Sequence, residues 1–291
     1  MLKGSIVALI TPFDEEGKVD FEKLRGLVNW HVEKGTDGIV VLGTTGEAAT
    51  MTHEECVSVV KTVVETAGGR IPVIAGSGSN CTSAMLEKSL TYEKLGVDGL
   101  LLIAPYYNKA NPEGMYHHFK IVADAVKIPC ILYNVPGRTG CSIPVEVVKR
   151  LSVHPNIVAI KEASGDISRA AEIARFVNDD FAMYSGNDDQ VLPILSLGGS
   201  GVISVWANVM PTEVHDMVAA FLNGDVKKAR ELQLAYLPFI NGLFMEVNPI
   251  PVKEAMKLAG MPVGGYRLPL CPMSESNREK LERIMKECGL I

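Results

Sequence analysis

Eight short runs of apolar and β-branched residues recur along the chain, and segments with helical spacing lie between them. In one such segment, residues 21–34, the side chains of Phe21, Leu24, Leu27 and Val28 share one face of a helix. The repeat is about 30 residues long, the size of one strand–helix–strand crossover. The runs lack strict polar alternation, which is typical of a parallel sheet covered on both faces. The predicted strands are residues 5–10, 38–42, 72–75, 99–104, 130–133, 157–160, 182–185 and 202–205.

Eight consecutive units of this kind predict an α/β fold, the closed TIM (β/α)8 barrel. The alternative is an open doubly wound sheet, which usually has fewer strands and carries G-x-G-x-x-G after its first strand, where this chain lacks that motif. From about Gly224 only helical patterns remain. We therefore predict a catalytic barrel over residues 1–223 and a C-terminal helical extension, packed on the barrel, over residues 224–291. The predicted helices of the extension are residues 225–237, 251–260 and 274–288.

Charge, hydropathy and cysteine spacing narrow the class of protein. The 291 residues carry a net charge of -6 with no run of lysines or arginines, which argues against nucleic acid and anionic membranes as partners. No stretch is long enough to span a bilayer, and the amino terminus lacks the pattern of a signal peptide. The six cysteines form no C-x-x-C pair and the six histidines share no metal-ligand spacing. We therefore predict no metal site and a cytoplasmic protein with reduced, mostly buried cysteines.

Reactive side chains follow the predicted strand ends, which is where a TIM barrel carries its active site. Several hydroxyls, one amine and one guanidinium would then converge on a single pocket. The segments after strands two, four, five, six and seven are residues 43–47, 105–108, 134–138, 161–162 and 185–189.

Lys161 is the strongest candidate for a catalytic residue in these segments. It directly follows Val158-Ala159-Ile160, so the barrel wall would enclose its stem while its amine points into the mouth. Loss of water around a lysine lowers the pKa of the amine and leaves a nucleophile that forms an imine with a carbonyl. The alternative is an ordinary salt bridge, for example with Glu162. The chain supplies too few acids at adjacent strand ends to hold the amine charged, which favours the nucleophile. Asp188-Asp189 are predicted to start a helix, because acids are favoured at the positive end of the helix dipole.

Five further side chains would reach the same end of the barrel: Tyr133, Tyr107, Thr44, Thr45 and Arg138. Each has an ordinary explanation. A barrel tyrosine is usually part of the core, a threonine before glycine can shape a turn or cap a helix, and a loop arginine is usually a solvated charge. Their shared position at one end of the barrel favours a catalytic or substrate-binding role. Hydroxyls in series can relay protons, and an arginine fork binds a carboxylate.

Taken together and in order, these motifs resemble those of the 4-hydroxy-tetrahydrodipicolinate synthase family, formerly called dihydrodipicolinate synthases. This family is part of the N-acetylneuraminate lyase-like superfamily of Schiff-base aldolases. The resemblance covers essentially the whole chain, and the set is highly specific although no single motif is. The segments that carry it are Thr11-Pro12-Phe13, Gly43-Thr44-Thr45-Gly46-Glu47, Pro105-Tyr106-Tyr107-Asn108-Lys109, Tyr133-Asn134-Val135-Pro136-Gly137-Arg138-Thr139, Ile160-Lys161-Glu162-Ala163, Ser185-Gly186-Asn187-Asp188 and Asn248-Pro249-Ile250-Pro251-Val252-Lys253.

The resemblance implies a lyase that condenses pyruvate with L-aspartate 4-semialdehyde on the route to diaminopimelate and lysine. Lys161 would attack the ketone of pyruvate to give an imine and then an enamine, whose carbon attacks the aldehyde. The adduct would cyclise through its own amine and release the lysine. No metal or organic cofactor is implied, since the covalent Schiff base performs the chemistry. The family is usually a homotetramer built from two tight dimers, so an oligomer is expected.

The resemblance also implies roles for individual residues. Tyr133, Thr44 and Tyr107 match the proton-relay triad of the family, in which the second tyrosine reaches in from a neighbouring subunit. Thr45 would hold the carboxylate of pyruvate, and Arg138 would hold that of the semialdehyde. Two further residues would line the pocket, namely Gly186 and, through its carbonyl, Ile203.

Family members that lysine inhibits bind this effector at the tight dimer interface. This chain departs from that pattern at two positions. Ala84 stands at about the position of the acid that usually meets the ammonium of lysine, and Cys56 stands where a histidine is often found. A buried cation without a carboxylate binds poorly, so we expect weak or no inhibition by lysine. The positions that agree with the effector site are Ala49, His53, Asn80 and Tyr106.

Three other functions are consistent with parts of the sequence. A sister aldolase, such as N-acetylneuraminate lyase or 2-keto-3-deoxygluconate aldolase, shares the lysine and the tyrosine, but Arg138 favours a second substrate with a carboxylate near the reacting carbon. A phosphate-binding barrel would explain Gly198-Gly199-Ser200-Gly201, yet these glycines precede the eighth strand and so lie at the opposite end. A non-catalytic barrel would not need the complete set of reactive groups.

Overall fold

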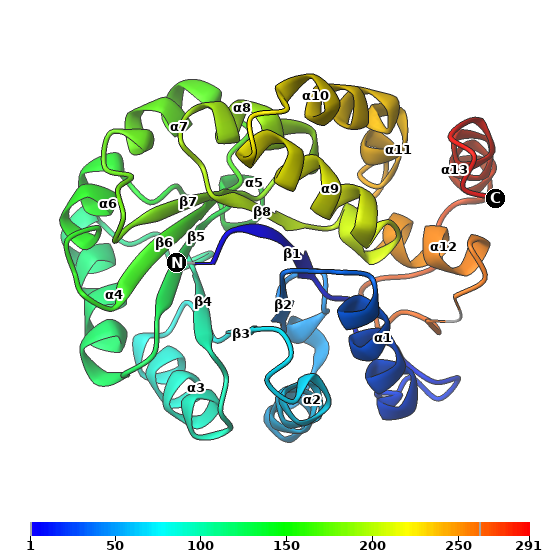
Figure 1. Ribbon diagram of the computed structural model, residues 1–291. Helices are drawn as coiled ribbons and strands as arrows, with labels where there is room; N and C mark the ends of the chain where they lie inside the picture. Colours follow the sequence, from blue (N-terminus) through cyan, green and yellow to red (C-terminus); the bar gives the residue numbers. More distant parts are fainter. Residues whose placement is uncertain (1, 262) are drawn as a thin grey trace.

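The computed structural model describes residues 2–261 and 263–291, and it confirms the predicted TIM barrel. Each strand pairs in parallel with the next one along the chain, and the eighth strand closes onto the first. Helices surround this barrel (Figure 1). The strands are β1 (Gly4–Ala8), β2 (Gly38–Val41), β3 (Val73–Gly76), β4 (Gly99–Ile103), β5 (Cys130–Asn134), β6 (Ile157–Glu162), β7 (Ala182–Ser185) and β8 (Gly201–Ser204).

The helices begin at the kinds of residue that favour helix starts. The Asp20 side chain accepts from the backbone N–H of Lys23, and Thr52 forms a capping box with Glu55. The α-helices are α1 (Phe21–Glu33), α2 (His53–Ala67), α3 (Thr82–Lys94), α4 (Pro112–Ala125), α5 (Pro136–Thr139), α6 (Val145–Leu151), α7 (Ile167–Ala174), α8 (Val191–Ser196), α9 (Pro211–Leu222), α10 (Val226–Ala235), α11 (Leu237–Gly242), α12 (Ile250–Leu258) and α13 (Glu275–Glu287), and the short 3-10 helices are η1 (Ala48–Thr50), η2 (Asp188–Gln190) and η3 (Trp206–Asn208).

Strands β5 and β6 continue into polar residues that the predicted strands left out. The register pairs Tyr133 with Lys161 and Asn134 with Glu162, so β5 and β6 both continue past their apolar runs. Lys161 therefore belongs to strand β6 itself, where the sequence pattern placed it just after the strand. The apolar pattern ended too early because the final residues of these strands are polar but still buried.

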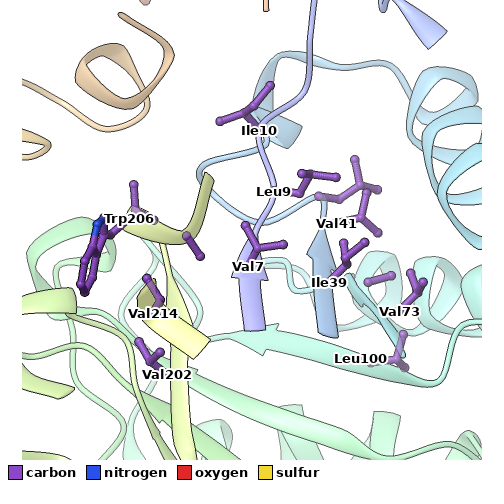
Figure 2. Close-up of a cluster of buried hydrophobic side chains, with 14 of the residues drawn as sticks. Val7, Leu9, Ile10, Ile39, Val41, Val73, Leu100, Val202, Trp206 and Val214 are labelled. Atoms are coloured by element: carbon purple, nitrogen blue, oxygen red, sulfur yellow. The ribbon is translucent and has the colours of Figure 1, made fainter. Parts of the chain in front are cut away.

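The core has two parts, one on each face of the barrel wall. Alternate strand residues such as Ile6 and Ala159 form one buried cluster inside the barrel. The residues between them, such as Val7 and Ile39, belong to a second cluster that includes side chains of the surrounding helices (Figure 2). Because side chains alternate along a strand, the next inward position of β6 after Ala159 is Lys161. The strand period therefore sends this lysine into the barrel.

The C-terminal part contains more helices than predicted. The predicted helix at residues 225–237 is two helices, since α10 ends before Tyr236 and α11 has a proline in its first turn, a position that proline favours. The other two predicted helices correspond to α12 and α13, which lie to one side of the barrel (Figure 1). The division between residues 223 and 224 stays a prediction, and residue 1 of the predicted barrel lies outside the described residues.

A buried ion pair joins this C-terminal part to the loop after β2. Lys253 Nζ, from α12, lies 2.6 Å from Glu47 Oε1 and donates to the Gly265 carbonyl at 2.7 Å. Lys253 is fully buried and Glu47 nearly so. Removing one partner from such a pair leaves an uncompensated buried charge, which is strongly destabilising. The ion pair therefore fixes the position of α12 relative to the loop after β2.

In the described part of the chain, no helix combines the length and the apolar character that a membrane crossing needs. All six cysteines are free. The prediction that most of them are buried is wrong, because only Cys56 and Cys130 are buried. Cys81 lies at the start of α3 and Cys271 lies in a loop before α13, and both side chains are exposed.

Candidate active site

Predicted site residues meet at the carboxyl end of the barrel. A cavity of about 380 Å³ is lined there by Thr44, Tyr133 and Arg138, together with Asn248 from the C-terminal part. Lys161 is not part of this lining, but it lies beside Tyr133, which is. Its Nζ atom is 4.5 Å from the centre of the Tyr133 ring, and only 5% of the residue is exposed.

Burial dominates the electrostatics of Lys161. Loss of water lowers the pKa of its amine from the ordinary lysine value to about 8, and Arg138 lowers it further while Asp188 opposes the change. The salt bridge with Glu162 that the sequence left open is not formed. The Glu162 carboxylate instead accepts from Asn134 Nδ2 at 3.0 Å and pairs with Arg169 at 3.4 Å. Within residues 2–261 and 263–291, no carboxylate forms an ion pair with the buried amine of Lys161.

Asp188 begins the short helix η2, as the sequence predicts. Its side chain also accepts from the backbone N–H groups of Val205 and Trp206, both at 2.9 Å, which the sequence did not suggest. Burial raises the pKa of this carboxyl group, and hydrogen bonds from Ser204, Trp206 and Val205 oppose that rise. Sequence reasoning missed Asp188 as part of the lysine's surroundings, although its position just after the seventh strand was a usable signal.

Gly186 packs against the stem of the lysine. A Cβ atom at this position would lie 2.9 Å from Lys161 Cε and 2.5 Å from Ala163 Cβ, so a side chain would displace the lysine. Ile203 is fully buried on β8 and belongs to the cluster inside the barrel. The structure thus places both predicted pocket residues on strands or loops at the barrel wall, with Gly186 directly beside Lys161.

Tyr133 and Thr44 are adjacent. Burial raises the pKa of the Tyr133 hydroxyl, and the nearby charge of Arg138 and a hydrogen-bonding contact with the Thr44 side chain oppose this rise. Both residues line the same cavity, and hydroxyls that lie in series can relay a proton. The structure therefore brings two of the three predicted relay residues to one cavity.

Tyr107, the third relay residue, is not brought to Lys161 within this chain. Its side chain is 89% exposed, and its backbone has a positive φ of 75°. Such a backbone is uncommon for a residue other than glycine. The loop after β4 therefore presents this tyrosine to the outside of the subunit.

Thr45 and Arg138 are both tied to Asn248. The Thr45 hydroxyl accepts from Asn248 Nδ2 at 2.9 Å, and Arg138 Nη2 donates to the backbone carbonyl of Asn248 at 3.1 Å. Sequence reasoning assigned no role to Asn248, because it lies 203 positions from Thr45. The available signal was its position at the start of the Asn248-Pro249-Ile250-Pro251-Val252-Lys253 motif.

Only two of the four predicted effector residues line the cavity at the carboxyl end of the barrel. Ala49 and Tyr106 line the 380 Å³ cavity, whereas the lining does not include His53 or Asn80. Lys88 contributes to the same lining, near the Cys56 thiol. This lysine places a positive charge where a cationic effector would have to bind, which was not anticipated.

The opposite end of the barrel offers no support for a phosphate site. A cavity of about 860 Å³ opens there, lined by residues such as Leu2, Ile74 and Tyr184 and by none of the predicted site residues. The backbone N–H groups of Gly198, Gly199 and Ser200 already donate to protein carbonyls at 3.0, 2.9 and 2.8 Å. They are not available to cradle a phosphate.

A (β/α)8 barrel whose inner wall carries a buried, readily deprotonated lysine, with a hydroxyl pair and an arginine at the mouth, defines the class of Schiff-base lyases. Within that class the family model described as the dihydrodipicolinate synthetase family matches residues 1–288. This chain belongs to that family.

Individual relatives agree over the full length. The 4-hydroxy-tetrahydrodipicolinate synthase of Clostridium tetani is 54% identical over 292 residues, covering 100% of this chain and 99% of the relative. The crystal structure of the chloride-inhibited dihydrodipicolinate synthase from Acinetobacter baumannii, complexed with pyruvate, is 44% identical and covers 100% of both chains with a TM-score of 0.97. The dihydrodipicolinate synthase structure from Aquifex aeolicus is 46% identical with a TM-score of 0.96, covering 99% of this chain and 98% of that one.

The lowered pKa of Lys161 gives a prediction that needs no substrate. Acetylation requires the neutral amine, so its rate at Lys161 should rise with pH around a midpoint of about 8, with about a tenth of the amine neutral at pH 7. Competitive labelling with acetic anhydride, read peptide by peptide by mass spectrometry, measures this midpoint. Exposed lysines of the same chain serve as controls for the general reactivity of amines in the labelling reaction.

The Asp188→Asn variant is the matched control for this titration. The charge of Asp188 favours the protonated amine, so its removal should shift the Lys161 midpoint to lower pH. A wild-type midpoint equal to that of the exposed lysines would contradict the claim that burial lowers the pKa of the Lys161 amine.

Proposed function

We propose that this chain is a 4-hydroxy-tetrahydrodipicolinate synthase, which condenses pyruvate with L-aspartate 4-semialdehyde in lysine and diaminopimelate biosynthesis. The observation that carries the proposal is the buried Lys161 amine at the carboxyl end of the barrel, with the carboxylate-binding candidates Thr45 and Arg138 nearby. Curated relatives that share about half of its residues bear this name, and the solved relative from Acinetobacter baumannii is described as a complex with pyruvate.

The first half of the reaction builds a nucleophilic carbon on the lysine. The neutral Lys161 amine adds to the ketone carbon of pyruvate, and loss of one water gives an imine. Loss of a proton from the methyl group then gives the enamine. Burial assists because it keeps the amine unprotonated before the attack.

The second half forms the carbon–carbon bond and frees the enzyme. The terminal carbon of the enamine bonds to the aldehyde carbon, and the aldehyde oxygen takes up a proton and becomes a hydroxyl. The amino group of the adduct then adds to the imine carbon and expels Lys161 as an amine, which closes the ring. The two substrates leave as one cyclic product and one water.

We assign the protein groups accordingly. Tyr133 and Thr44 relay protons between the lysine and bulk water, and Tyr107 of a second subunit completes the relay. Thr45 holds the carboxylate of pyruvate, and Arg138 holds that of the semialdehyde through a charge-assisted hydrogen bond. Gly186 and the Ile203 carbonyl line the pocket.

We propose no metal and no organic cofactor for this reaction, because the lysine itself provides the covalent intermediate. We also place the protein in the cytoplasm. The six free cysteines support this location, since reducing compartments keep thiols reduced.

The substrate assignment is tested by turnover and trapping together. Pyruvate and L-aspartate 4-semialdehyde should be consumed one to one, whereas N-acetylneuraminate and 2-keto-3-deoxygluconate should release no pyruvate. Borohydride with pyruvate should leave one adduct, on Lys161, when peptides are mapped by mass spectrometry. Lys161→Ala should lower the rate by roughly a thousandfold or more.

The exposed Lys109 provides the matched control, and Lys109→Ala should retain activity. An adduct on Lys109 or Lys253, or full turnover by Lys161→Ala, would show that the mechanism is wrong. Cleavage of either sugar acid at a rate above that of the condensation would identify the chain as a sister aldolase instead.

We further propose a homotetramer made of two tight dimers, in which Tyr107 crosses to the neighbouring site. The support is the exposed tyrosine on a strained loop described above. Mixing inactive Lys161→Ala with weakened Tyr107→Phe under conditions that exchange subunits should then restore activity. In a random mixture of dimers, one intact site per mixed dimer gives roughly a quarter of the wild-type sites.

The control for this complementation is a mixture of wild-type subunits with subunits that carry both substitutions. If Tyr107 serves the site of its own chain, the mixture of single variants should show no more activity than the sum of the two measured separately. That outcome would contradict the shared site.

Weak or absent inhibition by lysine stays a prediction. Ala84 and Cys56 supply no negative charge for the effector's ammonium, and Lys88 adds a positive one to the cavity lining. We expect activity to persist at millimolar lysine in a steady-state assay, and half-maximal inhibition at submillimolar lysine would contradict this. The double variant Ala84→Glu with Cys56→His should gain sensitivity.

A further inference from the structure

We propose that Asn248 is a positioning residue for the pyruvate site, and that its side-chain amide sets the direction of the Thr45 hydroxyl proton. This inference rests on the proposed function, in which Thr45 holds the carboxylate of pyruvate. It extends the site to a residue of the C-terminal part, outside the predicted barrel range.

The hydrogen-bonding capacity of a hydroxyl explains the effect. Asn248 Nδ2 donates to Thr45 Oγ1 at 2.9 Å, and the two residues are 6% and 3% exposed. A threonine hydroxyl has one proton to donate and lone pairs with which to accept. Once it accepts from the amide, its own proton must point elsewhere. The hydrogen bonds of the described residues include none in which the Thr45 hydroxyl donates to protein, so its proton remains for a ligand.

Asn248 is poorly explained by stability alone. Its Oδ1 atom is buried and has no hydrogen-bond partner in the described part of the chain. A buried amide oxygen without a partner costs free energy, which an apolar residue of similar size would avoid. The benefit of asparagine at this position is therefore the N–H group that it offers to Thr45.

A second contact already holds the two segments together. Two residues after Thr45, Glu47 forms the buried ion pair with Lys253, which lies five residues after Asn248. The ion pair supplies the attachment of the C-terminal part, so the Asn248 amide is not needed for that purpose. Removing the amide should leave the segments in place and change only the hydroxyl.

The contact with Arg138 supplies an internal control. Arg138 donates to the backbone carbonyl of Asn248, not to its side chain. A side-chain substitution therefore keeps the partner of Arg138 while it removes the partner of Thr45. Binding of pyruvate should suffer, and binding of the semialdehyde should not.

The experiment compares wild type, Asn248→Ala and Asn248→Asp. The pyruvate concentration that half-saturates borohydride trapping on Lys161 should rise roughly three- to tenfold in Asn248→Ala, the range expected for one neutral hydrogen bond. The KM for the semialdehyde should stay within about twofold. Asn248→Asp should weaken pyruvate more, because a carboxylate accepts the hydroxyl proton and repels the carboxylate of pyruvate.

A double-mutant cycle with Thr45→Val separates orientation from a general structural effect. Without the hydroxyl, Asn248→Ala should have no further effect on the half-saturating pyruvate concentration. A thermal melt of each variant checks the fold, and the midpoint for Asn248→Ala should match that of wild type within a few degrees.

The possible outcomes distinguish the inference from the function on which it rests. An unchanged half-saturation in Asn248→Ala, equal losses for both substrates, or an undiminished effect in the Thr45→Val background would overturn the role of Asn248 alone. A wild-type chain that traps no pyruvate on Lys161 would overturn the proposed function and this inference with it.

Discussion

The burial of the Lys161 amine without a contacting carboxylate is the constraint on which the rest of the site depends. A second lysine of the same chain shows what is unusual about it. Lys253 is equally enclosed, but Glu47 lies 2.6 Å from its amine and the Gly265 carbonyl accepts a further bond. Each amine also lies 4.5 Å from the centre of an aromatic ring, that of Phe13 for Lys253 and that of Tyr133 for Lys161. Of the two, only Lys253 has a carboxylate of the described residues within ion-pair distance. The difference in partners, and not in burial, separates this structural lysine from the proposed nucleophile.

Asp188 and Arg138 act on that amine in opposite directions. The carboxylate favours the protonated form and the guanidinium disfavours it. Asp188 is itself held by two backbone N–H groups at the start of η3, so the position of its carboxyl group is fixed by the barrel wall. A negative charge there, which does not touch the lysine, would leave the amine free to react and would stabilise the cationic imine of the proposed mechanism. Direct contact would have stabilised the ammonium instead.

The sequence allowed the fold and the centre of the site to be predicted because both depend on local periodicity. The strand period directs Lys161 inward, and the parallel barrel brings Thr44, Tyr133 and Arg138 to one end. Sequence reasoning missed the surroundings that depend on pairs distant along the chain. Asn248 meets Thr45 across 203 positions, and Lys253 meets Glu47 across 206. Neither pair has a periodic signal, and Tyr107, for which we propose a role in a second subunit, is exposed on its own chain.

These distant pairs change the meaning of the C-terminal part. The helical pattern after Gly224 predicts an extension packed on a complete barrel. In the structure, however, this part provides the hydrogen-bond donor to Thr45, the carbonyl that accepts from Arg138 and the cation that neutralises Glu47. Glu47 has a left-handed backbone with φ of 54°, which persists only when the surroundings hold it. The loop that follows β2 thus depends on the C-terminal part for its conformation, and the site is complete only when both parts are folded together.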